Sequence, residues 1–282
     1  METLLKRINR LGFTSYNFED VEIGEHLGEG GFGEVLKCHI KNKLFAAKRL
    51  FFEYDRTFEN FTQNLLNEFK LCRLLKDCKY FTQIYGYTFD KEHDELYIIM
   101  EYLPCGSFDD YNKKCVFTIQ EKLKIMSSLA LALKNLHKHD LIHCDLKLDN
   151  FSYHNRVKNP YVKLFDYNFM IKGKSDENKT VLGEAVTKGY CSPESFSDEE
   201  KVCKKSDIYS FGVIFLELML GYELWKNSDD IFRASKSINK ELKYFKKNNT
   251  EIGNIIEMCL TENIEERYNA SSLHRAINKL II

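Results

Sequence analysis

The chain has 282 residues, of which 44% are hydrophobic and 29% are charged, and its formal net charge is -1. This length is sufficient to bury a sizeable core, and the balance of apolar and charged residues excludes a disordered chain. The near-neutral charge gives no general attraction to nucleic acid or to an anionic membrane, so we expect no polyanionic partner.

The cysteines and the N-terminal segment carry no sign of secretion or membrane insertion. The nine cysteines are scattered without a CxxC pair, which argues against a disulfide framework or a structural zinc site. No apolar run reaches the ~18 residues of a membrane span, and METLLKRINRLGF lacks a signal-peptide core. We therefore expect reduced thiols and a cytoplasmic location. Residues 1–20 are predicted to be an N-terminal extension too short for a regulatory domain, with control coming from the rest of the chain or from separate partners.

The first predicted elements are strands around a glycine-rich segment. Residues 21–50 alternate in the manner of strands, and GEGGFGEV occupies positions 28–35. Glycines at 28, 30 and 33 let backbone N–H groups approach phosphate oxygens without a Cβ in the way. A GxGxxG segment also opens dinucleotide-binding units, but in these a helix follows the glycines. Residues 35–40 indicate a second strand instead, which favours a hairpin that covers a nucleotide.

A lysine and a glutamate follow on neighbouring elements. Lys48 lies in an apolar strand at residues 44–50, and a lysine on the third strand after a glycine-rich hairpin can reach nucleotide phosphates. A surface lysine at a strand edge is the alternative. Residues 62–76 have the apolar spacing of a helix with one buried stripe. Glu68 lies on or beside that stripe, where it either pairs with Lys48 or makes an ordinary i,i+4 contact.

Two further strands complete the first half of the chain. Residues 81–89 and 96–102 are strand-like, and the second run changes at EYLPCGS, positions 101–107. A strand that ends in a proline and glycine segment is typical of a connection between lobes. We place the boundary near residue 103.

The second half centres on LIHCDLKLDN at residues 141–150, which follows a predicted helix at 119–139. Asp145 is suited to accept a proton from a hydroxyl, Lys147 to neutralise charge on a phosphoryl group, and Asn150 to hold a metal ion. A polar loop at a helix end is the alternative interpretation.

A short predicted strand at residues 161–165 leads to Asp166. Asp166 is expected to lie about one hairpin away from Asn150. Two oxygen ligands at that separation suit a hard cation such as magnesium bound to nucleotide phosphates.

In their order along the chain, these motifs resemble a eukaryotic-type protein kinase catalytic domain from about residue 20 to 282. The set is GEGGFGEV, the AAK strand ending in Lys48, Glu68, HCDLKLDN, DYN at Asp166 and SPE ending in Glu194. The resemblance implies an α+β fold over residues 21–282, with a small antiparallel β lobe with one main helix (21–103), a larger mainly α-helical lobe (104–282) and ATP between them.

The resemblance also implies roles for single residues, with ATP and Mg²⁺ as cofactors. Lys48, held by Glu68, would contact the α- and β-phosphates; Asp145 would orient the substrate hydroxyl; and Asn150 and Asp166 would hold magnesium. The implied catalytic residues are Asp145, Lys147, Asn150, Lys48 and Glu68. The implied ATP-binding residues are Leu27, Gly28, Glu29, Gly30, Gly31, Phe32, Gly33, Val35, Ala46, Lys48, Met100 as gatekeeper, Glu101 and Leu103 through backbone groups, Ser107 and Ser152.

The implied substrates are serine and threonine hydroxyls of proteins. Lys147, two residues after Asp145, resembles the serine/threonine kinases. Thr187 matches a threonine that bonds both of these side chains in such kinases, and a solvent-facing loop threonine is the alternative.

Two further matches concern the scaffold. Asp207 would bond the backbone of the 141–150 loop, and Arg267 would pair with Glu194. We expect these residues to hold the structure without taking part in the chemistry.

The sequence departs from the family pattern at Leu148, which replaces the usual proline of the 141–150 loop, and at four positions that carry predictions. Cys144 replaces an arginine that receives an activation-segment phosphate in many kinases, so we expect activity without that phosphorylation. Tyr167 and Asn168 replace the phenylalanine and glycine of the DFG triplet, which predicts restricted movement of this turn. Ser152 replaces an apolar residue beneath adenine, which predicts weaker nucleotide binding.

These departures leave two classes of function open. The first is an ATP-dependent protein kinase, and the second is a pseudokinase that binds nucleotide weakly and acts as a scaffold or allosteric partner. The complete set of Lys48, Glu68, Asp145, Asn150 and Asp166 favours the enzyme, because a chain freed from catalysis has no chemical need for all five.

Overall fold

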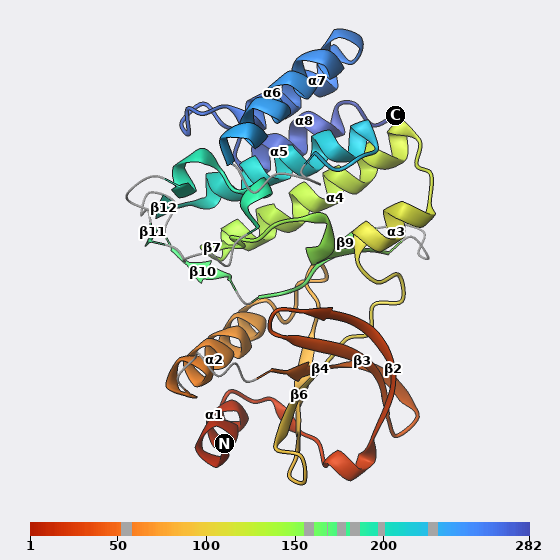
Figure 1. Cartoon of the computed structure of the whole chain (residues 1–282), viewed down its shortest axis with the longest axis vertical. Coiled ribbons are helices and arrows are strands. Elements are labelled where there is room, and N and C mark those ends of the chain that lie inside the picture. The colour runs from red at the N-terminus through yellow and green to blue at the C-terminus, as the bar shows by residue number, and fades with distance from the viewer. Residues whose placement is uncertain are drawn as a thin grey trace. The chain divides into compact units, whose positions relative to one another are not determined.

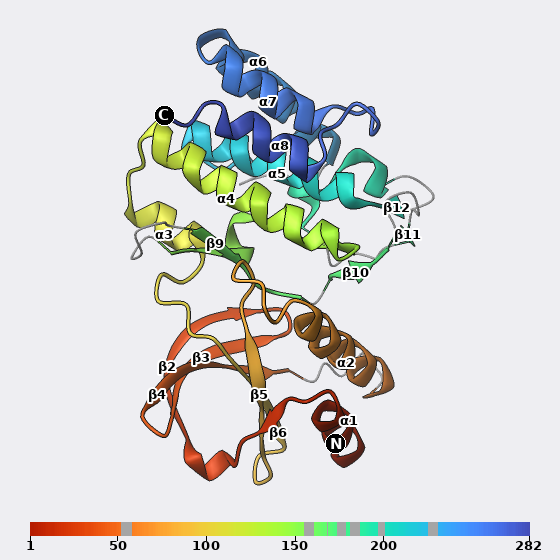
Figure 2. The same cartoon turned by 180° about the vertical axis from the view of Figure 1, so that it is seen from behind.

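The structure is a computed structural model, and it describes residues 1–51, 58–154, 161–167, 169–173, 179–180, 187–196, 201–224 and 231–282. The chain divides into two compact units, Met1–Gly106 and Ser107–Ile282. The first unit is built on a β-sheet with two helices, and the second is mainly helical (Figures 1 and 2). The predicted α+β fold, with an antiparallel β unit and a helical unit, is confirmed.

A six-stranded sheet in the order β1-β5-β6-β4-β3-β2 forms the first unit. Neighbouring strands pair antiparallel except β1 and β5, which are parallel. Lys41 and Asn42 both have positive φ, at 49° and 62°, and turn β3 into β4. Such a two-residue turn matches the twist of the flanking strands. The strands are β1 (Thr14–Ser15), β2 (Val21–Gly30), β3 (Gly33–Ile40), β4 (Lys43–Leu50), β5 (Ile84–Asp90) and β6 (Glu95–Met100).

Two helices belong to the first unit, α1 (Glu2–Arg10) and α2 (Phe58–Leu74). The core cluster that they share with the sheet consists of Leu4, Ile8, Leu65, Leu66, Phe69, Tyr87, Leu96 and Ile98. Apolar residues of α1 therefore face inward while its charged residues face solvent. The segment that the sequence predicted to be an extension is an integral part of this unit.

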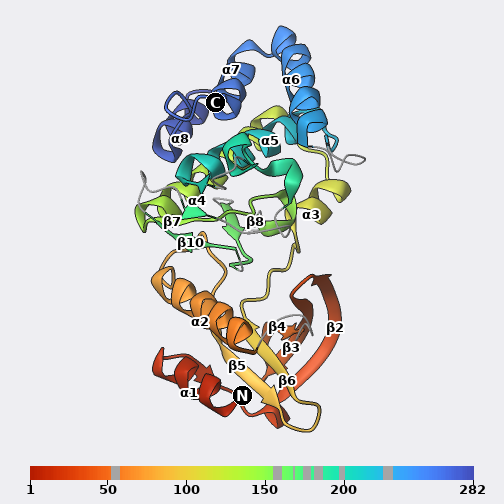
Figure 3. The same ribbon diagram turned by 60° about the vertical axis from the view of Figure 1, so that its left-hand side comes forward.

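Helices dominate the second unit. They are α3 (Phe108–Lys114), α4 (Ile119–Lys138), α5 (Lys204–Leu220), α6 (Ile231–Asn248), α7 (Thr250–Leu260) and α8 (Ala270–Asn278), and Figure 3 shows α5 running between the other long helices. Residues 206–218 of α5 are all buried. A Cβ at Gly212 would lie 2.7 Å from the Cys259 Cβ, so a glycine is needed for α5 to approach α7.

Three short strand pairs position the loops of this unit. They are β7 (Leu141–Ile142) with β10 (Ile171–Lys172), β8 (Phe151–His154) with β9 (Tyr161–Leu164), and β11 (Lys179–Thr180) with β12 (Lys201–Val202). The loop between β7 and β8 contains the acidic, basic and amide residues singled out in the sequence. Within the described ranges, no helix is long and apolar enough to traverse a bilayer.

Candidate active site

Asp207 of the buried helix α5 holds the loop that follows β7 through hydrogen bonds to the loop backbone. The Asp207 carboxylate accepts hydrogen bonds from the backbone N–H groups of His143, at 3.0 Å, and Cys144, at 3.1 Å. It also contacts His137 Nε2 at 2.8 Å. A buried carboxylate requires such partners, because leaving it unpaired is costly. The prediction that Asp207 bonds the backbone of this loop is confirmed.

Asp145 lies at the centre of a set of short polar contacts. Asn150 Nδ2 donates to the Asp145 backbone oxygen at 2.7 Å and to Oδ2 at 2.9 Å. Lys147 Nζ lies 3.2 Å from Asp145 Oδ2, so two residues of the same loop contact this carboxylate. These contacts fix the orientation of a side chain that is only 7% exposed.

Thr187 joins the two charged side chains of the loop. Its hydroxyl donates to Asp145 Oδ1 at 2.8 Å and accepts from Lys147 Nζ at 2.9 Å. The predicted double contact is confirmed, and the solvent-facing alternative for Thr187 is wrong. The Thr187 N–H also donates to Asp145 Oδ1, at 3.4 Å, so Thr187 contacts this carboxylate through both its backbone and its side chain.

Asp166 is brought next to Asn150 by the pairing of β8 with β9. The Phe165 N–H donates to the Asn150 backbone oxygen at 3.0 Å, and the next residue, Asp166, has a positive φ of 63°. Because the Asn150 amide nitrogen is oriented toward Asp145, its Oδ1 lies on the opposite side of the amide. Asn168, to which the sequence assigned the turn, lies outside the described residues.

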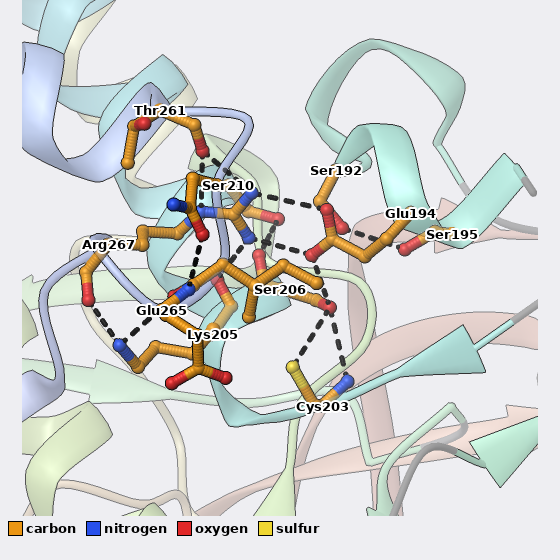
Figure 4. Close-up of polar contacts among 12 residues, drawn as sticks. Ser192, Glu194, Ser195, Cys203, Lys205, Ser206, Ser210, Thr261, Glu265 and Arg267 are labelled. Atoms are coloured by element: carbon orange, nitrogen blue, oxygen red, sulfur yellow. Dashed lines mark hydrogen bonds and ion pairs between the residues drawn. The ribbon is translucent and has the colours of Figure 1, made fainter.

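Arg267 and Glu194 form an ion pair (Figure 4). Arg267 also donates to the backbone oxygens of Thr261 and Lys205, and Ser206 Oγ donates to Glu194 Oε1 at 3.1 Å. Burial raises the pKa of Glu194, but the bond and charge of Arg267 outweigh it and hold this pKa below its usual range. The predicted pairing is confirmed.

Tyr190 and Glu217 form a contact that sequence reasoning missed. The Tyr190 hydroxyl donates to Glu217 Oε2 at 2.8 Å, and the Leu224 N–H donates to Oε1 at the same distance. Glu217 is 2% exposed, and burial raises its pKa to about 7. The available signal was Glu217 itself, a carboxylate in the otherwise uncharged residues 208–220 of α5.

In the first unit, the glycine-rich residues form the β2–β3 hairpin. A Cβ at Gly28, Gly30 or Gly31 would meet no atom within 4 Å, so these positions leave open space beside the backbone. A Cβ at Gly33 would lie 2.1 Å from the Arg49 backbone oxygen, and glycine is needed there for close strand packing. The predicted hairpin is confirmed, because strand β3 and not a helix follows the glycines.

The remaining predicted residues of this unit line up on the neighbouring strands and on α2. Lys48 of β4 pairs with Val35 of β3 on one side and with Ile98 of β6 on the other, and Ala46 pairs with Met100. Leu27, Glu29 and Phe32 belong to the hairpin segment. Glu68 is a buried residue of α2, at 7% exposure, so it lies on the inward stripe as predicted.

Backbone bonds define the segment after β6. The Glu101 N–H donates to the Gln83 oxygen at 2.8 Å, and the Gly106 N–H donates to the Leu103 oxygen at 3.0 Å. Ser107 caps the N-terminus of α3 by accepting from the Asp110 N–H at 3.1 Å. Its hydroxyl thus has a structural role in the second unit.

Ser152 of β8 is fully buried, and its hydroxyl has no hydrogen-bond partner in the described part of the chain. A buried hydroxyl without a partner costs stability. The sequence singled out this residue as a departure, but burial without a partner depends on packing that the sequence did not reveal.

Comparison with known proteins identifies the family. The family model described as protein kinase domain matches residues 21–276, and the chain belongs to this family. It is 30% identical over 258 residues to calcium-dependent protein kinase 5 of Plasmodium berghei, covering 89% of this chain and 44% of that protein. It is 28% identical over 238 residues to mouse (Mus musculus) aurora kinase B, covering 84% and 65%. The chain thus spans less than two thirds of the length of these relatives.

Proposed function

We propose that this protein kinase transfers the γ-phosphoryl group of ATP to serine and threonine hydroxyls of protein substrates. The observation that carries the proposal is the contact of Thr187 with both Asp145 and Lys147. This arrangement fixes the orientation of the Asp145 carboxylate, and the Lys147 ammonium group lies 3.2 Å from it. A hydroxyl oriented by Asp145 would have a cation beside it, where negative charge accumulates during phosphoryl transfer.

The similarity to calcium-dependent and aurora kinases supports the same class of reaction. We assign Lys48, paired with Glu68, to the α- and β-phosphates of ATP. The backbone N–H groups of the glycine-rich hairpin would bind the triphosphate. The Glu101 carbonyl and the Leu103 N–H would supply an acceptor and a donor for adenine. The further residues assigned to ATP are Leu27, Val35, Ala46, Met100, Ser107 and Ser152.

Asn150 and Asp166 are the residues that would hold magnesium. Both offer oxygen ligands, and the hydrogen bond from the Phe165 N–H to the Asn150 backbone oxygen supports this assignment, because Asp166 directly follows Phe165. Two protein ligands suit Mg²⁺, which keeps several waters and binds substrate phosphates in the remaining positions. When bound, the ion would neutralise charge on the phosphates. The contribution of this chain is to fix the Asn150 amide through its two bonds to Asp145.

The proposal is tested by incubating the full chain with radiolabelled ATP, Mg²⁺ and a generic protein substrate. We expect label on serine and threonine after acid hydrolysis. The matched control is Asp145→Asn, which keeps the size of the side chain and is expected to remove transfer while retaining the fold by circular dichroism. Nucleotide binding without any transfer by the wild type would support the pseudokinase alternative, and label on tyrosine alone would contradict the proposed specificity.

A further inference from the structure

The N-terminal segment contacts the helix that carries Glu68 over much of that helix's length. Leu4 and Ile8 of α1 are buried in one cluster with Leu65, Leu66 and Phe69 of α2. Phe69 directly follows Glu68 in the sequence, and Leu65 lies three residues before it. Removal of α1 would therefore uncover the part of α2 on which the position of Glu68 depends.

Two further contacts secure the same segment to α2. The rings of Phe13 and Phe69 meet edge to face, with their centroids 4.7 Å apart and an interplanar angle of 75°. Arg73 Nη1 donates to the backbone oxygen of Leu11 at 2.9 Å, at the C-terminal end of α1. The segment thus holds α2 at more than one turn.

The same segment is also bonded to the sheet. Strand β1 pairs with β5, and a Cβ at Gly86 would lie 1.9 Å from the Thr14 backbone oxygen. Any side chain at position 86 would therefore prevent this pairing. The Tyr87 hydroxyl donates to Asn9 Oδ1 at 3.0 Å, and Thr88 Oγ1 donates to the Tyr16 backbone oxygen at 3.0 Å.

One row of the sheet links this segment to Lys48. Ser15 is paired with Tyr87, Tyr87 with Ile98, and Ile98 with Lys48. Residues opposite each other on adjacent strands project to the same face of a sheet. Lys48 therefore shares the face on which Tyr87 and Ile98 pack in the cluster with α1 and α2.

We infer that residues 2–16 are a positioning element that fixes α2 relative to β4 and so keeps Glu68 beside Lys48. The segment contacts α2, which carries Glu68, and it pairs with the row of the sheet that contains Lys48. The inference rests on the proposed function, in which these two side chains act together on the phosphates of ATP.

The test compares full-chain variants of residues 2–16 with a control variant in a second hydrophobic cluster of the first unit. Ile8→Ala and Phe13→Ala remove contacts with α2, while Phe13→Leu retains much of the apolar contact. Ile40→Ala truncates a buried residue of the cluster that contains Val21, Cys38 and Ala47, which Tyr16 borders but which is separate from the cluster of α1 and α2. We expect Ile8→Ala and Phe13→Ala to lower kcat about 10- to 100-fold, the range for slight misplacement of reacting groups, with the KM for protein substrate unchanged.

Phe13→Leu is expected to restore most of kcat, and Ile40→Ala is expected to retain it at a comparable melting temperature. Where Ile8→Ala does not fold, Asn9→Ala provides a milder change, because it removes only the partner of the Tyr87 hydroxyl. Equal losses of kcat in Phe13→Ala and Ile40→Ala at matched melting temperature would overturn the inference.

Hydrogen exchange of the amides of residues 64–70 provides a readout that needs no phosphoryl transfer. We expect faster exchange there in Phe13→Ala than in Ile40→Ala. Unchanged exchange in Phe13→Ala would refute the positioning role even if the wild type is active. If the wild type transfers no phosphate, the proposed function fails, and the exchange comparison still decides whether residues 2–16 hold α2.

Discussion

Arg267 and Glu194, 73 positions apart, are joined by two hydrogen bonds, of 2.7 Å from Nη1 to Oε1 and 3.1 Å from Nη2 to Oε2. Arg267 is 1% exposed. A buried pair of this kind is costly to break from one side, because the remaining charge loses its partner. The C-terminal part of the chain is thereby tied to the segment that precedes α5.

Arg267→Ala is expected to lower the free energy of unfolding by about 3–5 kcal/mol, because it removes a fully buried guanidinium and leaves the partly buried Glu194 carboxylate without its cation. Urea denaturation at pH 7 measures this change. The control is Lys246→Ala, which removes an exposed ion pair with Glu257 and is expected to cost less than about 1 kcal/mol. Equal midpoints for the two variants would contradict the prediction.

The same pair predicts acid sensitivity. Because the pKa of Glu194 is lowered in the folded state, its contribution to stability is present above the unfolded value of about 4.3 and is lost as the pH falls through the folded pKa. The wild type is therefore expected to lose its advantage over Arg267→Ala below about pH 4.

Several of these contacts could be predicted from the sequence, because each depends on a residue in a short motif with a fixed spacing. Thr187, Asp207 and Arg267 were each assigned a partner, and the structure brings each pair together. The strands within residues 21–50 and the helices α2 and α4 were also predicted from local patterns. Each of these contacts is therefore signalled by the short motif that contains the residue.

Other features depend on packing between distant segments and left weak local signals. The helix at residues 2–10 is short, and its inward face is defined by α2, some 60 residues away. Tyr190 and Glu217 meet only because α5 passes behind the loop that contains Tyr190. No sequence motif marks either contact. The sequence therefore predicted only an extension for residues 1–20, and it predicted no contact between Tyr190 and Glu217.

Thr187→Ala is expected to lower kcat about 10- to 100-fold, because Asp145 and Lys147 lose the hydroxyl that aligns them. Thr187→Ser keeps this hydroxyl and is expected to recover most of the activity. Initial-rate kinetics with a saturating protein substrate measure the change, and thermal unfolding checks that both variants are folded. An Ala variant as active as the Ser variant would show that the alignment is unnecessary.

Glu217→Gln is expected to make the protein more stable at pH 8 and to reduce its pH dependence. Burial raises the pKa of Glu217 to about 7, so between about pH 4.3 and pH 7 the folded state binds more protons than the unfolded state. Stability therefore falls as the pH rises through this window. The loss at pH 8 is on the order of 4 kcal/mol, from 1.36 kcal/mol for each unit of pKa difference.

Glutamine can preserve both contacts, because its oxygen accepts from the Leu224 N–H while its amide donates to the Tyr190 hydroxyl. Melting temperatures from pH 5 to pH 8 provide the measurement. Parallel curves for the wild type and the variant would contradict a carboxyl that titrates in this range. Tyr222→Phe, which removes a surface bond to Glu241, serves as the control for loss of an exposed contact.

Phosphatase treatment is expected to leave phosphoryl transfer within about twofold of the untreated level, since no cation stands at position 144 to receive an activation-segment phosphate. Cys144 instead has a positive φ of 69°, and its backbone N–H is held by Asp207. Burial, followed by the charge of Asp207, raises the pKa of the Cys144 thiol well above its usual range. This thiol is neutral at physiological pH, so it offers no charge to a phosphate. Cys144→Ser should behave as the wild type in the same assay, because serine also carries no positive charge. A tenfold loss of wild-type activity after dephosphorylation would contradict the prediction.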